Sequence, residues 1–165
     1  MTTAQATSPA TAPSLAWSED LMLGLDAIDR THEEFVQLLA ETEMAADDVL
    51  LAKLQALTEH TIDHFEREDQ WMASTQFGPM NCHAMQHRVV LQTLEELMRR
   101  GRDDGELDLV REILPELGKW FSQHAQTMDA GLAVHLEQVG FDPATGHMTT
   151  PPEAQAGCGS ASCAS

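Results

Sequence analysis

Seven side chains of types that bind metal ions occur in this chain in a regular order. Five are histidines and two are carboxylates: His32, His64, Glu68, His83, His87, His124 and Asp129. His64 and Glu68 are four residues apart, as are His83 and His87, and residues with this spacing project from the same face of a helix. His124 and Asp129 are five residues apart, which still keeps them near one helix face. Imidazoles and carboxylates that converge between helices could hold two metal ions.

These seven side chains fall where the helical pattern otherwise places apolar residues. A single histidine of this kind would most simply be a hydrogen-bonded core residue, but that explanation fails for seven together. Burying unpaired carboxylates and clustered imidazoles costs several kcal/mol per group, whereas a whole domain is stable by only about 5–15 kcal/mol. Two divalent or trivalent cations at the centre would supply the compensating charge.

The donor types narrow the choice of metal. All are nitrogen or oxygen donors, which disfavours Cu(I) and iron–sulfur clusters. A structural zinc site would use four ligands and commonly include cysteine. Imidazole combined with carboxylate suits non-haem iron, and also manganese or zinc.

The number of donors predicts how they divide between two metals. If Glu68 and Asp129 bridge both metals together with an oxo or hydroxo group, the five histidines must divide three and two. The second metal then keeps one open position, for which dioxygen is the leading candidate.

Four amphipathic segments are expected to position these residues. Gly78-Pro79 separates the second from the third, Gly101 to Gly105 is expected to form a loop, and Gly140 marks the end of the fourth. Short connections imply antiparallel neighbours, so the sequence predicts an all-α, up-down-up-down antiparallel four-helix bundle with disordered N- and C-terminal tails. The predicted helices cover approximately residues 27–45, 49–74, 80–100 and 107–138.

The ends of the chain differ in composition from the middle. Residues 1–16 are rich in Ala, Thr, Ser and Pro and are expected to form a disordered arm before a bundle at 17–140. Residues 141–165 are expected to form a flexible tail, in which Cys158 and Cys163 could pair as a redox-sensitive disulfide or capture a metal ion. Cys82 is expected to be a small buried residue that points away from the site.

The charge balance excludes several classes of function. The formal net charge is -18, from 27 acidic and 9 basic residues, which argues against binding to nucleic acids or to anionic membranes. No stretch approaches the roughly 20 apolar residues needed to span a bilayer. The first residues lack the features of a signal peptide, and three cysteines do not make a disulfide framework. The expected compartment is the cytoplasm, and the oligomeric state is left open.

The ordered pattern H…HxxxE…HxxxH…HxxxxD resembles that of the hemerythrin family in its bacterial form. The resemblance covers roughly residues 17 to 137, and the complete ligand pattern separates the chain from looser relatives with an HHE domain. It rests on Trp17, on LGLDAIDRTHEEF (23–35), on EHTIDHFEREDQWM (59–72), on HAMQH (83–87) and on KWFSQHAQTMD (119–129).

The resemblance implies a non-haem di-iron centre that binds dioxygen reversibly, as a carrier, store or sensor. It implies that Glu68 and Asp129 bridge, that His32 and His64 bind the iron with the open position, and that the other three histidines bind the closed iron. An electron-donor protein is a candidate partner. Phe35 and Trp71 are candidates for the wall of the dioxygen pocket, while His60 and His135 are expected to lie outside the ligand set.

Two other functions could use the same centre. One is an enzyme, such as a peroxidase or a nitric-oxide or peroxide detoxifier, and the other is a protein of iron handling or repair. The ligand types favour dioxygen binding, because oxygen-activating di-iron enzymes of the ferritin-like class use mostly glutamate with two histidines.

Overall fold

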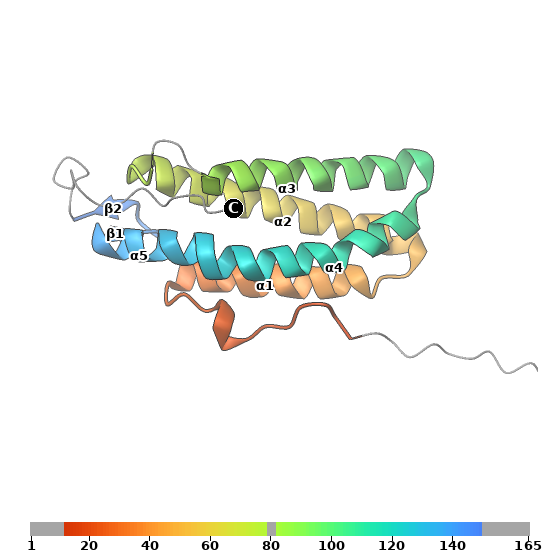
Figure 1. Ribbon diagram of the computed structural model, residues 1–165, viewed down its shortest axis with the longest axis horizontal. Coiled ribbons are helices and arrows are strands. Elements are labelled where there is room, and N and C mark those ends of the chain that lie inside the picture. Colours follow the sequence, from red (N-terminus) through yellow and green to blue (C-terminus); the bar gives the residue numbers. More distant parts are fainter. Residues whose placement is uncertain (1–11, 79–81, 150–165) are drawn as a thin grey trace, which may run out of the picture.

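The computed structural model of the protein describes residues 12–78 and 82–149. Within them, long helices lie side by side with alternating direction, so the expected all-α four-helix bundle is confirmed (Figure 1). The last rod of the bundle is formed by α4 and α5, which a π-helical turn joins into one continuous helix. The elements are α1 (Asp26–Glu43), α2 (Asp47–Ser74), α3 (Cys82–Arg99), α4 (Leu107–His124), the π-helical turn Ala125–Asp129 and α5 (Ala130–Gln138).

The connection between α3 and α4 differs from the expected loop. The chain continues past α3 as a π-helical turn, Arg100–Asp104, and turns only at Gly105, whose φ is +71°. Gly101 lies in this turn against α2, where an added Cβ would come within 2.5 Å of the side chain of Leu51. The helical structure therefore persists through a stretch whose glycines indicated a loop, and Gly101 lies within it against the side chain of Leu51. At the other end, Gly140 with a φ of +59° follows Val139, the C-cap of α5, and ends the helix as expected.

Apolar side chains form two separate buried clusters along the bundle. The larger cluster fills the half in which α1 ends and α2 begins, and it includes Phe35, Leu54, Phe65, Leu94, Leu114 and Phe121. The smaller cluster fills the other half, and it consists of Ile28, Met72, Leu132, Ala133, Leu136, Val139 and Phe141. Along α1, His32 lies between Ile28 and Phe35, and along α2, Glu68 lies between Phe65 and Met72. A buried polar layer thus separates the two apolar clusters.

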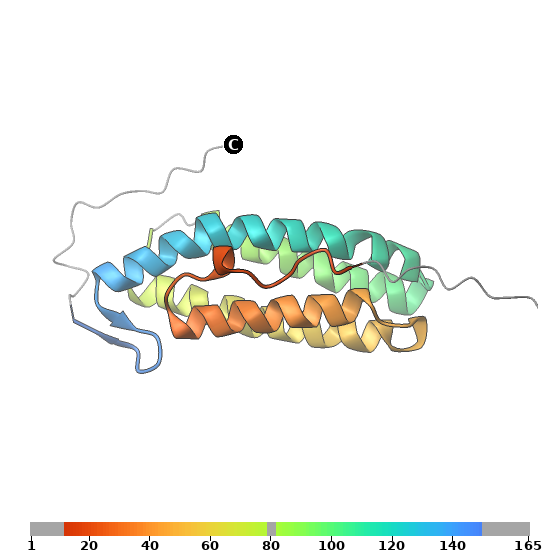
Figure 2. The same cartoon turned by 90° about the horizontal axis from the view of Figure 1, so that it is seen from below.

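The segment before α1 is packed along the bundle. Figure 2 shows it running between α1 and the rod formed by α4 and α5. Ser14 donates its backbone N–H to the carboxylate of Glu43, Leu15 and Trp17 pack against the larger cluster, and Leu21 is fully buried in a short 3-10 turn, Glu19–Leu21. Residues 12–16 therefore take part in the fold, although the sequence placed them in a disordered arm, while residues 1–11 lie outside the described residues.

A small hairpin follows α5, where the sequence indicated only a flexible tail. Strands β1 (Phe141–Asp142) and β2 (His147–Met148) pair antiparallel, with Phe141 opposite Met148. Phe141 is buried in the smaller cluster and Met148 packs against it, so the hairpin closes this end of the bundle. Cys158 and Cys163 lie outside the described residues. Among the described helices, none is long and apolar enough to cross a membrane.

Candidate metal centre

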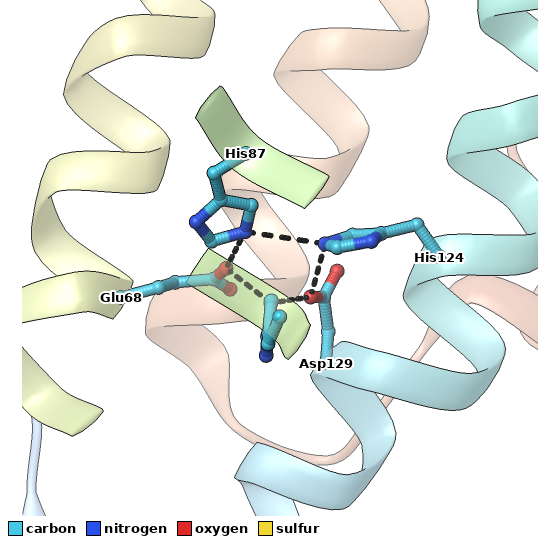
Figure 3. A group of neighbouring side chains, drawn as sticks. Glu68, His87, His124 and Asp129 are labelled. Carbon is cyan, nitrogen blue, oxygen red and sulfur yellow. Dashed lines mark hydrogen bonds and ion pairs between the residues drawn. The ribbon is translucent and has the colours of Figure 1, made fainter. Parts of the chain in front are cut away.

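All seven predicted ligand side chains converge in the polar layer between the two apolar clusters. Each is at most 2% exposed. α1 contributes His32, α2 contributes His64 and Glu68, and the remaining four come from α3 and from the rod of α4 and α5. Figure 3 shows Glu68, His87, His124 and Asp129 pointing toward a common centre. The structure therefore brings together every side chain that the sequence pattern singled out.

The donor atoms fall into two overlapping groups. Within each group, one atom per residue lies within 4.8 Å of every other, and each group could hold one metal ion. Both groups contain Glu68 and Asp129. One adds His83, His87 and His124, and the other adds His32 and His64. The histidines thus divide three and two around a shared pair of carboxylates.

Each shared carboxylate turns one oxygen toward each group. Oε1 of Glu68 lies 3.2 Å from Nε2 of His64, whereas Oε2 lies 3.4 Å from Nε2 of His83 and 3.3 Å from Nε2 of His87. Oδ2 of Asp129 lies 3.1 Å from Nε2 of His32, whereas Oδ1 lies 2.9 Å from Nε2 of His83. This is the orientation in which a carboxylate can bridge two cations.

Three of the histidines are held by hydrogen bonds from the ring nitrogen that faces away from the centre. Nδ1 of His32 donates to the backbone carbonyl of Leu21 at 3.2 Å. Nδ1 of His87 donates to the carboxylate of Asp69, and Nδ1 of His124 to the side-chain oxygen of Gln86, each at 3.0 Å. Such bonds place the proton on Nδ1 and leave the lone pair of Nε2 free to bind a metal.

These outer partners were not predicted from the sequence. Asp69 and Gln86 directly precede or follow a predicted ligand, at positions where a helix turns the side chain partly away from the centre. A polar residue adjacent in sequence to a predicted ligand was therefore the signal from which these two partners could have been predicted. Leu21 could not have been found in this way, because it acts through its backbone carbonyl.

The donor set fits bound cations better than it fits an empty core. With protons on Nδ1, the Nε2 atoms of His87 and His124 face each other with lone pairs only 3.2 Å apart. None of the four carboxylate oxygens of Glu68 and Asp129 has an aligned hydrogen-bond donor among the described residues. Buried polar atoms are nearly always satisfied in folded proteins. Positive charge placed between these atoms would satisfy the lone pairs and the carboxylates at once.

A π-helical turn brings Asp129 into the centre. In a regular α-helix the residue four positions after His124 would share its face, and that residue is Met128. Because the turn Ala125–Asp129 contains one additional residue, Asp129 takes the inward position instead, with Oδ1 3.1 Å from Nε2 of His124. Accordingly, Met128 is only half-buried whereas Asp129 is fully buried.

The carboxylates change the protonation of the metal-free centre. Burial disfavours the charged form of His83, but its interactions with Asp129 and Glu68 outweigh burial and raise the pKa of His83 to about 9. Burial also works against ionised Asp129, yet His124, His32 and His83 hold the pKa of Asp129 well below its usual range. The centre therefore attracts positive charge, as protons or as metal ions.

Aromatic rings enclose the group that contains only two histidines. The ring of Phe121 meets the ring of His32 edge-on, with centroids 5.2 Å apart, and lies 6.3 Å from the ring of His64. Phe35 stacks on Phe121 at 3.9 Å. Phe35 was a predicted wall residue and supports this wall from behind, whereas Trp71, the other candidate, packs against the smaller apolar cluster. Phe121 was not singled out from the sequence as a wall residue.

The other residues considered from the sequence lie outside the two donor groups. His60 is half-buried, and its Nε2 lies 3.1 Å from the backbone carbonyl of Thr31. Nε2 of His135 lies 3.2 Å from the backbone carbonyl of Thr75. Cys82 is half-buried and forms a disulfide, so the expectation of a small buried residue is wrong.

Comparison with known proteins agrees with this geometry. Residues 23–136 match the family model described as "Hemerythrin HHE cation binding domain", which is more than half of the chain. The chain belongs to the hemerythrin family. It is similar to a protein named "Bacteriohemerythrin" from Ralstonia nicotianae, with 38% identity over 130 residues that cover 79% of this chain and 94% of that protein.

More distant members of the hemerythrin family are also similar. A "Bacteriohemerythrin" from Stenotrophomonas maltophilia is 26% identical over 75% of this chain and 85% of that protein. A "Myohemerythrin" from Sipunculus nudus is 28% identical over 68% of this chain and 86% of that protein. No solved structure matches the chain. The matched hemerythrin segment begins at residue 23, so Leu21, which accepts the hydrogen bond of His32, lies just before it.

Proposed function

We propose that the seven side chains bind two iron ions and that the protein binds dioxygen reversibly at the end that contains His32 and His64. The observation that carries this proposal is the uneven division of histidines around Glu68 and Asp129. With both carboxylates shared, one cation is offered five protein donors and the other only four, so the second has room for a small ligand. Imidazole with carboxylate is a donor set suited to non-haem iron, and a bound pair of ferrous ions would supply the electrons and the open position for dioxygen.

The protein's own residues would orient and protect this site. The hydrogen bond from His32 to Leu21 fixes one imidazole of the two-histidine group. Phe121 and Phe35 place stacked apolar rings beside the same group, which would exclude water and protons from the place where a small ligand binds. When water and protons cannot reach the bound ligand, its release in unchanged form is favoured. Return of oxidised iron to the ferrous state would need electrons, so we also propose an electron-donor protein as a partner.

The donor composition supports binding over catalysis. Five neutral imidazoles and two carboxylates offer fewer anionic donors than the glutamate-rich centres of ferritin-like di-iron enzymes. Highly oxidised iron is therefore stabilised less by this set. The proposal is tested against three alternative functions: a peroxidase, a detoxifier of peroxide or nitric oxide, and a protein of iron repair.

Anaerobic reconstitution with ferrous iron, followed by exposure to air, tests the proposal. We expect two irons per chain and a visible absorption band that appears with air and disappears when dioxygen is removed. Irreversible oxidation with consumption of peroxide would favour the enzyme. Transfer of iron to a second protein or to a weak chelator would favour iron handling.

Two histidine variants provide matched comparisons in the same experiment. Replacing His64 by Ala should reduce the iron content toward one ion per chain and abolish the reversible band. Replacing His135, which lies outside the donor groups, should change neither. Equal loss of iron in both variants would contradict the assignment of the two-histidine group.

A further inference from the structure

A groove of about 320 Å³ opens between α3 and α4. Its base is formed by buried apolar side chains, among them Val90, Leu94 and Leu117. Among the described helices, α3 and α4 approach each other less closely than the pairs α1–α2, α2–α3 and α1–α4. The groove is therefore a real gap on one side of the bundle, and its volume lies at the lower end of the roughly 300–1,000 Å³ typical of small-molecule sites.

One end of the groove reaches the candidate metal centre. Trp120 and Gln86 both line it. The ring of Trp120 stacks on the ring of His124, with centroids 4.5 Å apart and planes 27° apart. The side-chain oxygen of Gln86 accepts the hydrogen bond from Nδ1 of His124 at 3.0 Å. A molecule in the groove would thus contact two residues that both hold one proposed iron ligand.

Among the described residues that line the groove, two N–H donors have no hydrogen-bond partner, the amide of Gln86 and the indole N–H of Trp120. The hydroxyl of Thr93 donates to the backbone carbonyl of Val89 at 2.9 Å, and the carboxylate of Glu116 is paired with Lys119 at 2.6 Å. The amide nitrogen of Gln86 has no hydrogen-bond partner in the part of the chain that the structure describes. The groove therefore offers an indole ring, apolar walls and two N–H donors, those of Gln86 and Trp120.

We propose that this groove binds a planar, uncharged and mostly apolar molecule that carries a carbonyl oxygen, which is the chemistry of a quinone. Its ring packs against Trp120, and its carbonyl oxygen accepts a hydrogen bond from the free amide of Gln86. An anionic molecule is disfavoured because the chain has a net charge of -18. This inference goes beyond the proposed function and does not depend on dioxygen binding.

Other occupants fit the groove less well. Residues 1–11 and 150–165 contain no large apolar side chain except Met1, so neither end of the chain supplies a segment that would fill an apolar groove. A second copy of the chain also fits the groove less well, because the large apolar side chains that it exposes outside the groove are scattered over the described part of the molecule. They are Met22, Met44, Val49 and Val134.

Calorimetric titration of the iron-loaded full chain with duroquinone tests the proposal, with durene as a comparator of similar shape that lacks carbonyl groups. Duroquinone is fully substituted, so thiols do not add readily to its ring. We expect one site per chain. Replacing Val89, which is 57% exposed at the rim, by Phe should fill the groove and weaken binding at least about tenfold. The matched Val134→Phe variant, 54% exposed on α5, should bind within about twofold of the unchanged protein.

A second variant tests the hydrogen bond. Gln86→Met should weaken duroquinone about fivefold, the effect of one hydrogen bond, and leave durene unchanged, with the iron content measured alongside. The proposal is overturned if duroquinone does not bind, or if it binds Val89→Phe and the unchanged protein equally. It is also overturned if sedimentation shows a dimer that Val89→Phe dissociates, because a second copy would then cover the groove. None of these results depends on whether the iron binds dioxygen.

Discussion

His124 and Asp129 are five residues apart in the sequence, yet Nε2 of the histidine lies 3.1 Å from Oδ1 of the aspartate. The π-helical turn that separates α4 from α5 accounts for this contact, because it carries one residue more than an α-helical turn. Turns of this kind are rare and occur frequently at functional sites. The spacing of this ligand pair is therefore a property of the backbone as much as of the side chains.

Shortening and lengthening this turn by one residue should affect the iron content differently. Deletion of Thr127, which is exposed, would place His124 and Asp129 four residues apart in a regular α-helix and keep both near the centre. Insertion of one Ala after Gln126 would move Asp129 away. We expect the deletion variant to retain two irons per chain and the insertion variant to lose at least one, as measured by metal analysis after gel filtration. Loss of iron in both variants alike would show that the turn itself is required.

Phe121→Leu should admit water to the two-histidine group. The ring of Phe121 contacts His32, so a smaller side chain opens that wall. We expect faster oxidation of the ferrous protein in air, by about tenfold, together with a loss of roughly 1–2 kcal/mol in the free energy of unfolding. Decay of the visible band and urea denaturation measure the two effects.

Leu54→Val is the control for this variant. Leu54 is equally buried in the larger apolar cluster, but it precedes His64 by ten residues on α2, which is roughly 15 Å along the helix. A similar loss of stability with an unchanged oxidation rate is expected. Equal acceleration by both substitutions would show that general loosening of the core, and not the wall beside His32, controls the rate.

Asp69→Asn should weaken iron binding through His87. The Asp69 carboxylate accepts the Nδ1–H of His87 and is 42% exposed on its outer side. Loss of the negative charge makes the imidazole a poorer donor, and changes of this kind typically weaken metal affinity by roughly 10–100-fold. Competition with a ferrous chelator measures the change. Asp63→Asn, an exposed position on the same helix, should have no effect, and equal weakening by both would contradict the role of Asp69.

The metal-free protein should lose stability as the pH rises above neutrality. The pKa of His83 is raised from 6.5 to about 9 because Asp129 and Glu68 outweigh the effect of burial. The interactions of protonated His83 with these carboxylates stabilise the folded state fully below pH 6.5, and this contribution disappears as the pH rises through 9. His124, whose pKa is lowered by burial, is already neutral in this window and does not oppose the trend. Urea denaturation of the metal-free protein at both ends of the window measures the effect.

Iron should reverse this dependence on pH. A metal ion binds the neutral imidazole, so iron competes with the proton on His83 and its affinity should rise over the same window. Proton release on iron binding, measured in weakly buffered solution, should therefore decrease toward pH 9. A release that does not change with pH would contradict the raised pKa of His83.

Much of the fold and of the centre could be predicted from the sequence because the informative residues are local in spacing. Pairs four residues apart on helices identified His64 with Glu68 and His83 with His87, and glycine at position 140 marked the end of the last helix. The same logic failed where the helix departs from 3.6 residues per turn. A regular helical period would turn Met128 inward instead of Asp129, and the π-helical turn Arg100–Asp104 was expected to be a loop. A pattern of residue types does not show that a helical turn contains one additional residue.

Contacts between segments distant in the sequence were beyond reach for a different reason. The carbonyl of Leu21 reaches His32 because the chain before α1 folds back along the bundle, and the ring of Phe121 reaches it because α4 packs against α1. Leu21 has an apolar side chain that suits any core position, and its carbonyl is a group that every residue possesses. Likewise, Phe141 and Met148 close the end of the bundle from a segment whose composition indicated a tail.

The polar layer between the two apolar clusters gives the metal a part in folding cooperativity. The side chains that lie between the two clusters in the core include Glu68 and Asp129, whose carboxylate oxygens have no aligned hydrogen-bond donor among the described residues. Bound cations would therefore act as cross-links between two halves that otherwise communicate mainly along the helix backbones. Without iron, the half closed by the hairpin would be free to unfold locally while the other half stays folded. Iron binding would therefore determine whether the two halves of the bundle unfold together.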